Sequence, residues 1–182
     1  MKHYVITGLF IFITAITGYA QTPLSADRIM KEAQVIAAKE KKNVFIIFHA
    51  SWCGWCHRMD SSLSDKSCRK FFDENYIIRH LVVKESKTKK NLENPGALEL
   101  LTKYHGEELG IPFWLIFDKD GNLLADSRMK TDIADTTSGG PNSGCPAAKE
   151  EVAYFLRVLK KTSSITDEQA ALIEKRFREN DY

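Results

Sequence analysis

The stretch Val44-Phe-Ile-Ile-Phe48 constrains the fold of this 182-residue chain more than any other part of its sequence. Its five consecutive apolar residues do not alternate with polar ones, which indicates that both faces of the segment are buried. A strand of this kind lies inside a sheet that helices cover on both sides. We therefore predict an α/β fold with this strand in the interior of a central mixed sheet.

The segments around this strand predict the order β-α-β-α-β-β-α, with helices at both ends. An Asp-Gly pair between two apolar runs predicts a hairpin. We expect helices over Ser25–Lys41, Cys53–Ser62, Asp65–Asn75 and Pro95–Tyr104, one after Pro146, and one that begins at the N-cap Thr166 with Gln169 in a capping box. We expect strands over Ile77–Lys84, Ile111–Phe117 and Leu123–Ser127, a charged loop over Glu85–Asn94, and a long surface loop over Met129–Gly144.

The first twenty residues have the layout of a secretory signal peptide. Lys2 and His3 precede an uncharged apolar run over residues 5–16, and Gly18 and Ala20 suit a cleavage site. An uncleaved membrane anchor is the alternative, although threonines and glycines dilute the run. We expect residues 1–20 to be removed, leaving a single domain over 21–182, with its core at about 25–161 and a C-terminal helix at about 166–180.

The string Trp52-Cys-Gly-Trp-Cys-His57 follows the buried strand almost directly, and two chemistries compete for it. Cys-x-x-Cys-His is the attachment motif of a c-type haem, whereas Cys-x-x-Cys in a βαβ context is typical of a redox dithiol. The position at the end of a buried strand favours the dithiol. There the first turn of a helix offers free N–H groups and a dipole that stabilise a thiolate, which is the reactive form.

Two segments together, "FIIFHASWCGWC" and "GIPFWLIFDKDGN", closely resemble the active-site strand and the cis-proline strand of the thioredoxin superfamily. The resemblance covers about residues 25–161 and is closest to secreted bacterial thioredoxin-like proteins of the thiol:disulfide interchange type. It implies that Cys53 is the exposed nucleophile and Cys56 the resolving thiol. It also implies a cis bond before Pro112, which leaves the backbone of Ile111 to pair with a bound peptide.

The same resemblance places Trp52 beside the motif, and Trp55 is either a substrate contact or a packing residue. Ile47 stands where cytosolic thioredoxins have a buried Asp that handles the proton of the resolving thiol. His57 shares a helix face with Cys53 and is a candidate modulator of its pKa, with a solvated side chain as the alternative. His49 suits a packed, hydrogen-bonded histidine better than a metal ligand.

Two further cysteines, Cys68 and Cys145, lie far apart in the sequence. Cys68 falls on an apolar stripe with Phe71 and Phe72 and suits a buried apolar position. Cys145 lies in a loop, where an exposed free thiol would be a liability outside the cytosol. A Cys68–Cys145 disulfide would remove that liability, and two free thiols are the alternative.

These features predict an exported, periplasmic or secreted, thiol–disulfide oxidoreductase that acts on partner proteins, more in the reducing direction. The alternatives are an oxidase or isomerase that uses the same site, and a non-catalytic protein that binds a client or a metal. We expect a monomer that needs no cofactor and no metal. The net charge of +2 and the lone basic cluster Lys87–Lys90, which we expect to be a solvated loop, do not indicate a nucleic-acid partner.

Overall fold

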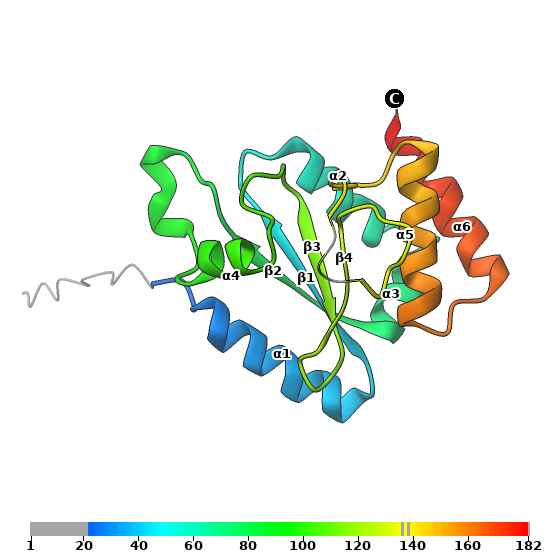
Figure 1. Ribbon diagram of the computed structural model, residues 1–182, viewed down its shortest axis with the longest axis horizontal. Coiled ribbons are helices and arrows are strands. Elements are labelled where there is room, and N and C mark those ends of the chain that lie inside the picture. Colours follow the sequence, from blue (N-terminus) through cyan, green and yellow to red (C-terminus); the bar gives the residue numbers. More distant parts are fainter. Residues whose placement is uncertain (1–21, 136, 138, 182) are drawn as a thin grey trace, which may run out of the picture.

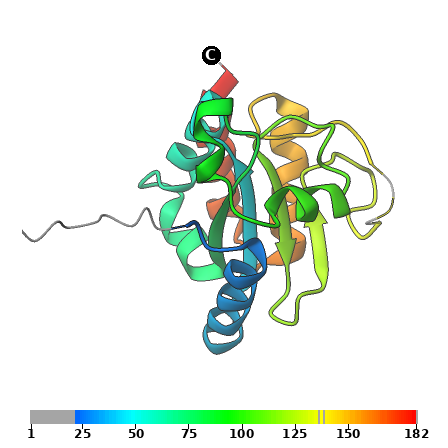
Figure 2. The ribbon, with the colours of Figure 1, turned by 90° about the vertical axis from the view of Figure 1, so that its left-hand side faces the viewer.

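The computed structural model describes residues 22–135, 137 and 139–181. A four-stranded sheet of order β2-β1-β3-β4 forms its centre, with helices on both faces (Figures 1 and 2). The predicted signal peptide and its cleavage site lie outside the described residues. Within the described part of the chain, no helix is both long and apolar enough to cross a membrane.

The strand that the sequence placed in the interior is β1 (Asn43–His49), and it lies between two neighbours. It pairs in parallel with β2 (Tyr76–Val82) and antiparallel with β3 (Phe113–Phe117). The hairpin partner of β3 is β4 (Leu123–Asp126) at the sheet edge. Residues 44–48 are buried without exception, which confirms that this strand has two covered faces.

The two faces of the sheet carry separate layers of apolar packing. On one face lie α1 (Ala26–Glu40) and α4 (Ala97–Lys103), which pack against the even-numbered residues of β1. The other face carries α2 (Gly54–Leu63), α3 (Arg69–Asn75), α5 (Lys149–Thr162) and α6 (Asp167–Arg178), followed by the 3-10 turn η2 (Glu179–Asp181). The predicted mixed sheet flanked by helices, with an extra C-terminal helix, is thereby confirmed.

The C-terminal helix starts as its sequence predicts. Thr166 accepts a hydrogen bond from the N–H of Gln169, and the Gln169 side chain accepts one from the N–H of Thr166. This reciprocal capping satisfies donors that the first helical turn leaves without partners. It fixes the start of α6, whose buried Ile173 and Phe177 pack into the layer over α2, α3 and α5.

Two predicted loops are more ordered than expected. The segment Glu85–Asn94 contains a 3-10 helix, η1 (Lys87–Leu92), and Glu85 at its start is 4% exposed. The charged sequence does not reveal the burial of Glu85, because its hydrogen-bond partner Ser51 lies far away in the chain. The expected long loop over residues 129–144 contains no named helix or strand among its described residues, and an isolated bridge between Arg128 and Asn142 ties its two ends together.

A buried ion cluster holds the start of that segment against the sheet. The carboxylate of Asp126 accepts hydrogen bonds from Arg128 at 2.7 Å and from the ammonium of Lys130 at 2.9 Å. All three side chains are at most 5% exposed. A buried charge is tolerated only with such partners, so Asp126 fixes where the segment leaves the sheet.

Candidate active site

The two cysteines of the motif lie at the junction of β1 and α2 and form a disulfide. Cys53 is the N-cap of α2, and its sulfur accepts a hydrogen bond from the N–H of Cys56 at 3.1 Å. The N–H of Cys53 donates in turn to the carbonyl of Ala50 at 3.1 Å. The predicted dithiol at the first turn of a helix is confirmed, and its sulfur occupies the place where a helix stabilises negative charge.

Both cysteines are buried, although the sequence analysis expected Cys53 to be exposed. Cys53 is 3% exposed and Cys56 is 1% exposed. The description of Cys53 as an exposed nucleophile is therefore wrong for this oxidised state, because Ala50 and Ile111 pack with the two cysteines. Cys53 is the more accessible of the pair by a small margin.

The two tryptophans of the motif provide the exposed apolar surface beside the disulfide. Trp52 is 60% exposed and Trp55 is 48% exposed. The indole N–H of Trp52 donates to the carbonyl of Lys84 at 2.9 Å, and the guanidinium of Arg58 lies 4.7 Å from the Trp55 ring centroid. Each ring is thus held in place by a polar partner while much of its surface faces solvent.

The segment before β3 lies directly across from Cys53. The Ile111–Pro112 peptide bond is cis, and Pro112 is buried. The carbonyl oxygen of Ile111 is 3.4 Å from the sulfur of Cys53. In the disulfide this sulfur has no proton to donate, so the contact becomes a hydrogen bond only when Cys53 is a reduced thiol.

Glu85 supports the turn that carries Cys53, a role that the sequence analysis missed. Its carboxylate accepts the N–H of Ser51 at 2.6 Å and the Ser51 hydroxyl at 3.0 Å. These bonds, the N–H of Ser51 above all, hold the pKa of Glu85 below its ordinary value. A carboxylate at the end of a predicted strand was the available signal, but the loop around it is rich in charges.

The three histidines near the motif, His49, His57 and His80, have different partners. The ring of His57 bonds to the backbone carbonyl of Ser51 at 3.1 Å, and its effect on Cys53 stays a prediction. His49 packs against the ring of His80 with centroids 4.8 Å apart, and His80 bonds to the carboxylate of Asp60 at 2.8 Å. Burial, and next the neighbouring His80, lower the pKa of His49.

Ile47 occupies a core position and brings no charge to the resolving cysteine. It is 1% exposed and packs among apolar side chains under α2. Its register partner on β2 is His80, which bonds to Asp60. The His80–Asp60 pair therefore lies next to Ile47, the position that the sequence analysis compared with a buried Asp of cytosolic thioredoxins. Within the described ranges, no three His, Cys, Asp or Glu side chains converge as metal ligands.

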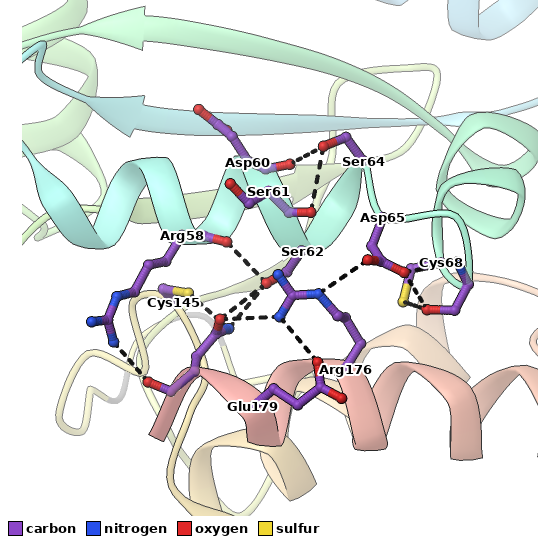
Figure 3. Close-up of polar contacts among 12 residues, drawn as sticks. Arg58, Asp60, Ser61, Ser62, Ser64, Asp65, Cys68, Cys145, Arg176 and Glu179 are labelled. Atoms are coloured by element: carbon purple, nitrogen blue, oxygen red, sulfur yellow. Dashed lines mark hydrogen bonds and ion pairs between the residues drawn. The ribbon is translucent and has the colours of Figure 1, made fainter. Parts of the chain in front are cut away.

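The proposed Cys68–Cys145 disulfide is absent, and both thiols are free and buried. Figure 3 places their sulfurs on either side of the Arg176 and Ser62 side chains. The prediction rested on an exposed Cys145, but that residue is 5% exposed and lies 3.4 Å from the amide of Asn180. Burial, not a disulfide, protects this thiol, and it raises the Cys145 pKa to about 12.

The C-terminal end of the chain is anchored to the active-site helix. Asn180 is 5% exposed, and its side chain donates to the hydroxyl of Ser62 at 3.0 Å. Its carbonyl accepts from Arg58, the same residue that covers Trp55. Figure 3 shows Arg58 and Ser62 on α2 above the C-terminal helix that carries Arg176. The 3-10 turn η2, which follows the extra helix, therefore holds α2 in place.

Two hollows bear on where ligands could bind. One of about 190 Å³ is lined by Trp55 of the motif, by Ile111 and Pro112, and by the segment from Asn142 to Cys145. A larger one of about 670 Å³ lies between α1 and α4, and none of its lining residues belongs to the motif. We assign the chemistry to the first, because only there do the cysteine-bearing helix and the cis-proline segment meet.

No curated protein sequence matches the chain. Among solved structures, it is similar to a disulphide isomerase from Xylella fastidiosa Temecula1, with 20% identity, 65% of this chain and 80% of the other covered, and a TM-score of 0.46. It is also similar to a DsbH oxidoreductase, with 21% identity, coverage of 86% and 94%, and a TM-score of 0.41.

A third similar structure is a putative protein disulfide isomerase from Bacteroides thetaiotaomicron, with 18% identity, coverage of 71% and 79%, and a TM-score of 0.40. The family model described as thioredoxin-like matches residues 29–119, which is half of the chain. The matched range contains β1, the Cys53–Cys56 pair and the whole of β3. The chain therefore belongs to the thioredoxin-like family.

Proposed function

We propose that this protein is an exported thiol–disulfide oxidoreductase that reduces disulfides in partner proteins. The observation that carries the proposal is the Cys53–Cys56 disulfide at the N-terminus of α2, facing the cis-proline segment at Ile111. Thioredoxin-like membership and a redox-active cysteine pair support thiol–disulfide exchange in general. The reducing direction, the clients and the export belong to the proposal.

The exchange uses the two sulfurs in sequence. The thiolate of Cys53 attacks one sulfur of a client disulfide, the client S–S bond breaks, and the other client sulfur leaves as a thiolate that takes up a proton. The thiolate of Cys56 then attacks Cys53 in the mixed disulfide and releases the second client thiol. The client disulfide gains two electrons, and the enzyme ends with the Cys53–Cys56 bond seen here. A dithiol of a redox partner protein restores the reduced pair.

The surroundings of Cys53 favour its role as the attacking group. Its sulfur lies at the helix N-terminus and accepts the N–H of Cys56, an arrangement that stabilises a thiolate. Cys56 is the less accessible sulfur, as a resolving group can be, because its target is already attached to Cys53. This division of roles predicts that C56S accumulates mixed disulfides with clients, whereas C53S does not.

Clients would bind over the exposed rings and the cis-proline segment. Trp52 and Trp55 offer apolar surface on one side of the disulfide, and Ile111 and Pro112 lie on the other. We propose that an extended client segment pairs with the backbone of Ile111, which brings its disulfide to Cys53. No organic cofactor or metal takes part in this scheme, and a monomer suffices for it.

Export is proposed on the N-terminal sequence alone. An apolar run after Lys2 and His3 and small residues at the predicted cut suit a signal peptide for a periplasmic or secreted bacterial protein. Fractionation of cells that express the full chain, with mass measurement of the product, tests it. A mature protein that begins near Gln21 outside the cytosol supports export, and an intact N-terminus in the cytosol refutes it.

The redox potential of the Cys53–Cys56 pair tests the direction of exchange. We expect a value of about −270 mV, near that of thioredoxin, from thiol trapping in dithiothreitol or glutathione buffers. A value of about −120 mV would indicate a disulfide donor instead, and an intermediate value of about −180 mV an isomerase.

Insulin reduction separates catalysis from simple binding. We expect the wild type to accelerate reduction by dithiothreitol and C53S to lose that acceleration. Equal rates with both proteins would support the alternative of a non-catalytic client- or metal-binding protein.

A further inference from the structure

The carbonyl groups of the segment before β3 are held by two side chains from distant parts of the chain. The ammonium of Lys84 donates to the carbonyl of Glu107 at 2.6 Å and to that of Leu109 at 2.8 Å. The side-chain amide of Asn142 donates to the carbonyl of Gly110 at 2.7 Å and to that of Pro112 at 3.0 Å. Each donor therefore bridges two carbonyls of the same short segment.

The carbonyl of Ile111 lies between the two groups that Asn142 binds, and it has a different neighbour. Its oxygen faces the sulfur of Cys53 at 3.4 Å. Asn142 binds the carbonyls of Gly110 and Pro112, and the Ile111 carbonyl between them in the sequence faces the disulfide. The pattern of bonds leaves this carbonyl to face the place where a client would lie.

Asn142 is itself rigidly placed. Its side-chain oxygen accepts the N–H of Gly144 at 3.0 Å, and its backbone bridges to Arg128 beside the buried Asp126 cluster. The next residue, Ser143, is 3% exposed and bonds to the carbonyl of Ser127 through both its N–H and its hydroxyl. The segment that ends the 129–144 stretch is thus a fixed support for the active site.

Lys84 links the same segment to the motif. It has a left-handed backbone conformation, with φ at 55°, and its carbonyl accepts the indole N–H of Trp52. The residue therefore joins an exposed ring beside Cys53 to the carbonyls of Glu107 and Leu109. Two supports, Lys84 and Asn142, hold the segment that faces the disulfide.

We propose that Lys84 and Asn142 are positioning residues, which hold the segment 107–112 so that the Ile111 peptide unit meets an incoming protein client. The inference deepens the proposed function and rests on it. It assigns to the 129–144 stretch a part in client binding through Asn142, without contact to the reacting sulfurs. Small disulfides, which have no peptide backbone to pair with Ile111, do not need this support.

Asn142→Asp tests the assignment with little change in shape. The aspartate keeps an acceptor for the N–H of Gly144 but turns an oxygen toward the carbonyls of Gly110 and Pro112. We expect the KM for insulin, with dithiothreitol as the reductant, to rise about tenfold, which equals about 1.4 kcal/mol of client binding. The rate with hydroxyethyl disulfide and the potential of the cysteine pair should stay within about twofold and about 10 mV of wild type.

Asn94→Asp is the matched control. Asn94 also donates to a backbone carbonyl, that of Leu24 at 2.8 Å, and accepts a backbone N–H, that of Val82 at 2.7 Å. It binds none of the carbonyls of residues 107–112. Its substitution has the same chemistry and should leave both the KM for insulin and the small-disulfide rate unchanged.

Lys84→Met provides an independent variant that keeps the length of the side chain but removes the ammonium. We expect the same selective rise in KM, smaller than for N142D because its carbonyl partners are farther along the chain from Ile111. If either folded variant keeps the wild-type KM, or loses activity toward insulin and hydroxyethyl disulfide in equal proportion, the assignment is wrong. A wild type that fails to reduce insulin would instead overturn the proposed function, and the inference with it.

Discussion

Glu85 offers the sharpest test of how the active-site turn is held. Its carboxylate is buried and accepts two hydrogen bonds from Ser51, at 2.6 and 3.0 Å, two residues before Cys53. Glu85→Gln keeps the shape and one acceptor oxygen but removes the charge and turns an NH₂ group toward a donor. Because a hydrogen bond to a charged group contributes about 1.5–3 kcal/mol, we expect a loss of about 2 kcal/mol in the free energy of unfolding at pH 7.

The loss is measurable by chemical and thermal unfolding of the oxidised protein. For a domain of this size it corresponds to a fall in Tm of about 4–8 °C. Ser51→Ala is the companion variant, since it removes the 3.0 Å bond and keeps the 2.6 Å bond to the backbone N–H. S51A must therefore cost less than E85Q.

The difference in unfolding free energy between wild type and E85Q should depend on pH, and this dependence gives the result that would refute the reasoning. The pKa of Glu85 in the folded protein lies below its ordinary 4.5, so its stabilisation is fully present above that value. It is lost as the pH falls through the folded pKa, and there the unfolding free energies of wild type and E85Q converge. A difference that is the same at pH 7 and in acid would show that the charge of Glu85 is not what stabilises the turn.

Three further predictions concern the thiols, the histidines and the core. Iodoacetamide should leave Cys68 and Cys145 unmodified in the native protein and label both after unfolding, because both are buried and burial raises the pKa of each thiol. Peptide mapping that finds the two cysteines joined would contradict the structure. The pKa of His49 in the folded protein lies below its ordinary 6.5, in surroundings that include His80, His57, Asp60 and Glu85, so the unfolded chain binds a proton there more readily than the folded protein does. The free energy of unfolding should therefore fall as the pH drops below about 6.5. Urea unfolding across that range should show a smaller fall in H49Q. Phe155→Ala should lower the free energy of unfolding by about 3–5 kcal/mol, because the fully buried ring packs against those of Trp114 and Phe177. Leu172→Ala, on the exposed side of α6, should change it by less than about 0.5 kcal/mol. Equal losses in the two variants would contradict the assigned core.

Local sequence patterns were enough to predict the framework of the fold. The unbroken apolar run of β1 requires two covered faces, and the burial of residues 44–48 between the two apolar layers bears this out. The capping box at Thr166 involves residues three positions apart, so the chain can specify it without distant contacts. The Cys53–Cys56 pair is equally local, because one helical turn brings the two sulfurs together.

The supports of the active site could not be predicted in the same way. Glu85 meets Ser51 across 34 positions of sequence, and Asn142 meets Gly110 across 32. Each of the two residues lies in a polar segment whose sequence is compatible with an exposed position as well as with a buried one. Only the pairing of β1 with β2, and of β3 with β4, brings these segments to the end of the sheet where the disulfide lies.

The cysteines show the same division most clearly. The spacing of Cys53 and Cys56 and their place after a buried strand predicted the disulfide, whereas the exposure of Cys53 was predicted wrongly and the state of Cys68 and Cys145 was left open between a disulfide and two free thiols. Burial depends on which side chains from other elements cover a residue: Ile111 packs against Cys53, and Asn180 lies against Cys145. The sequence by itself determined which two sulfurs can react with each other. The tertiary structure decided how much of each sulfur a partner can reach, because the covering groups come from segments far away in the chain.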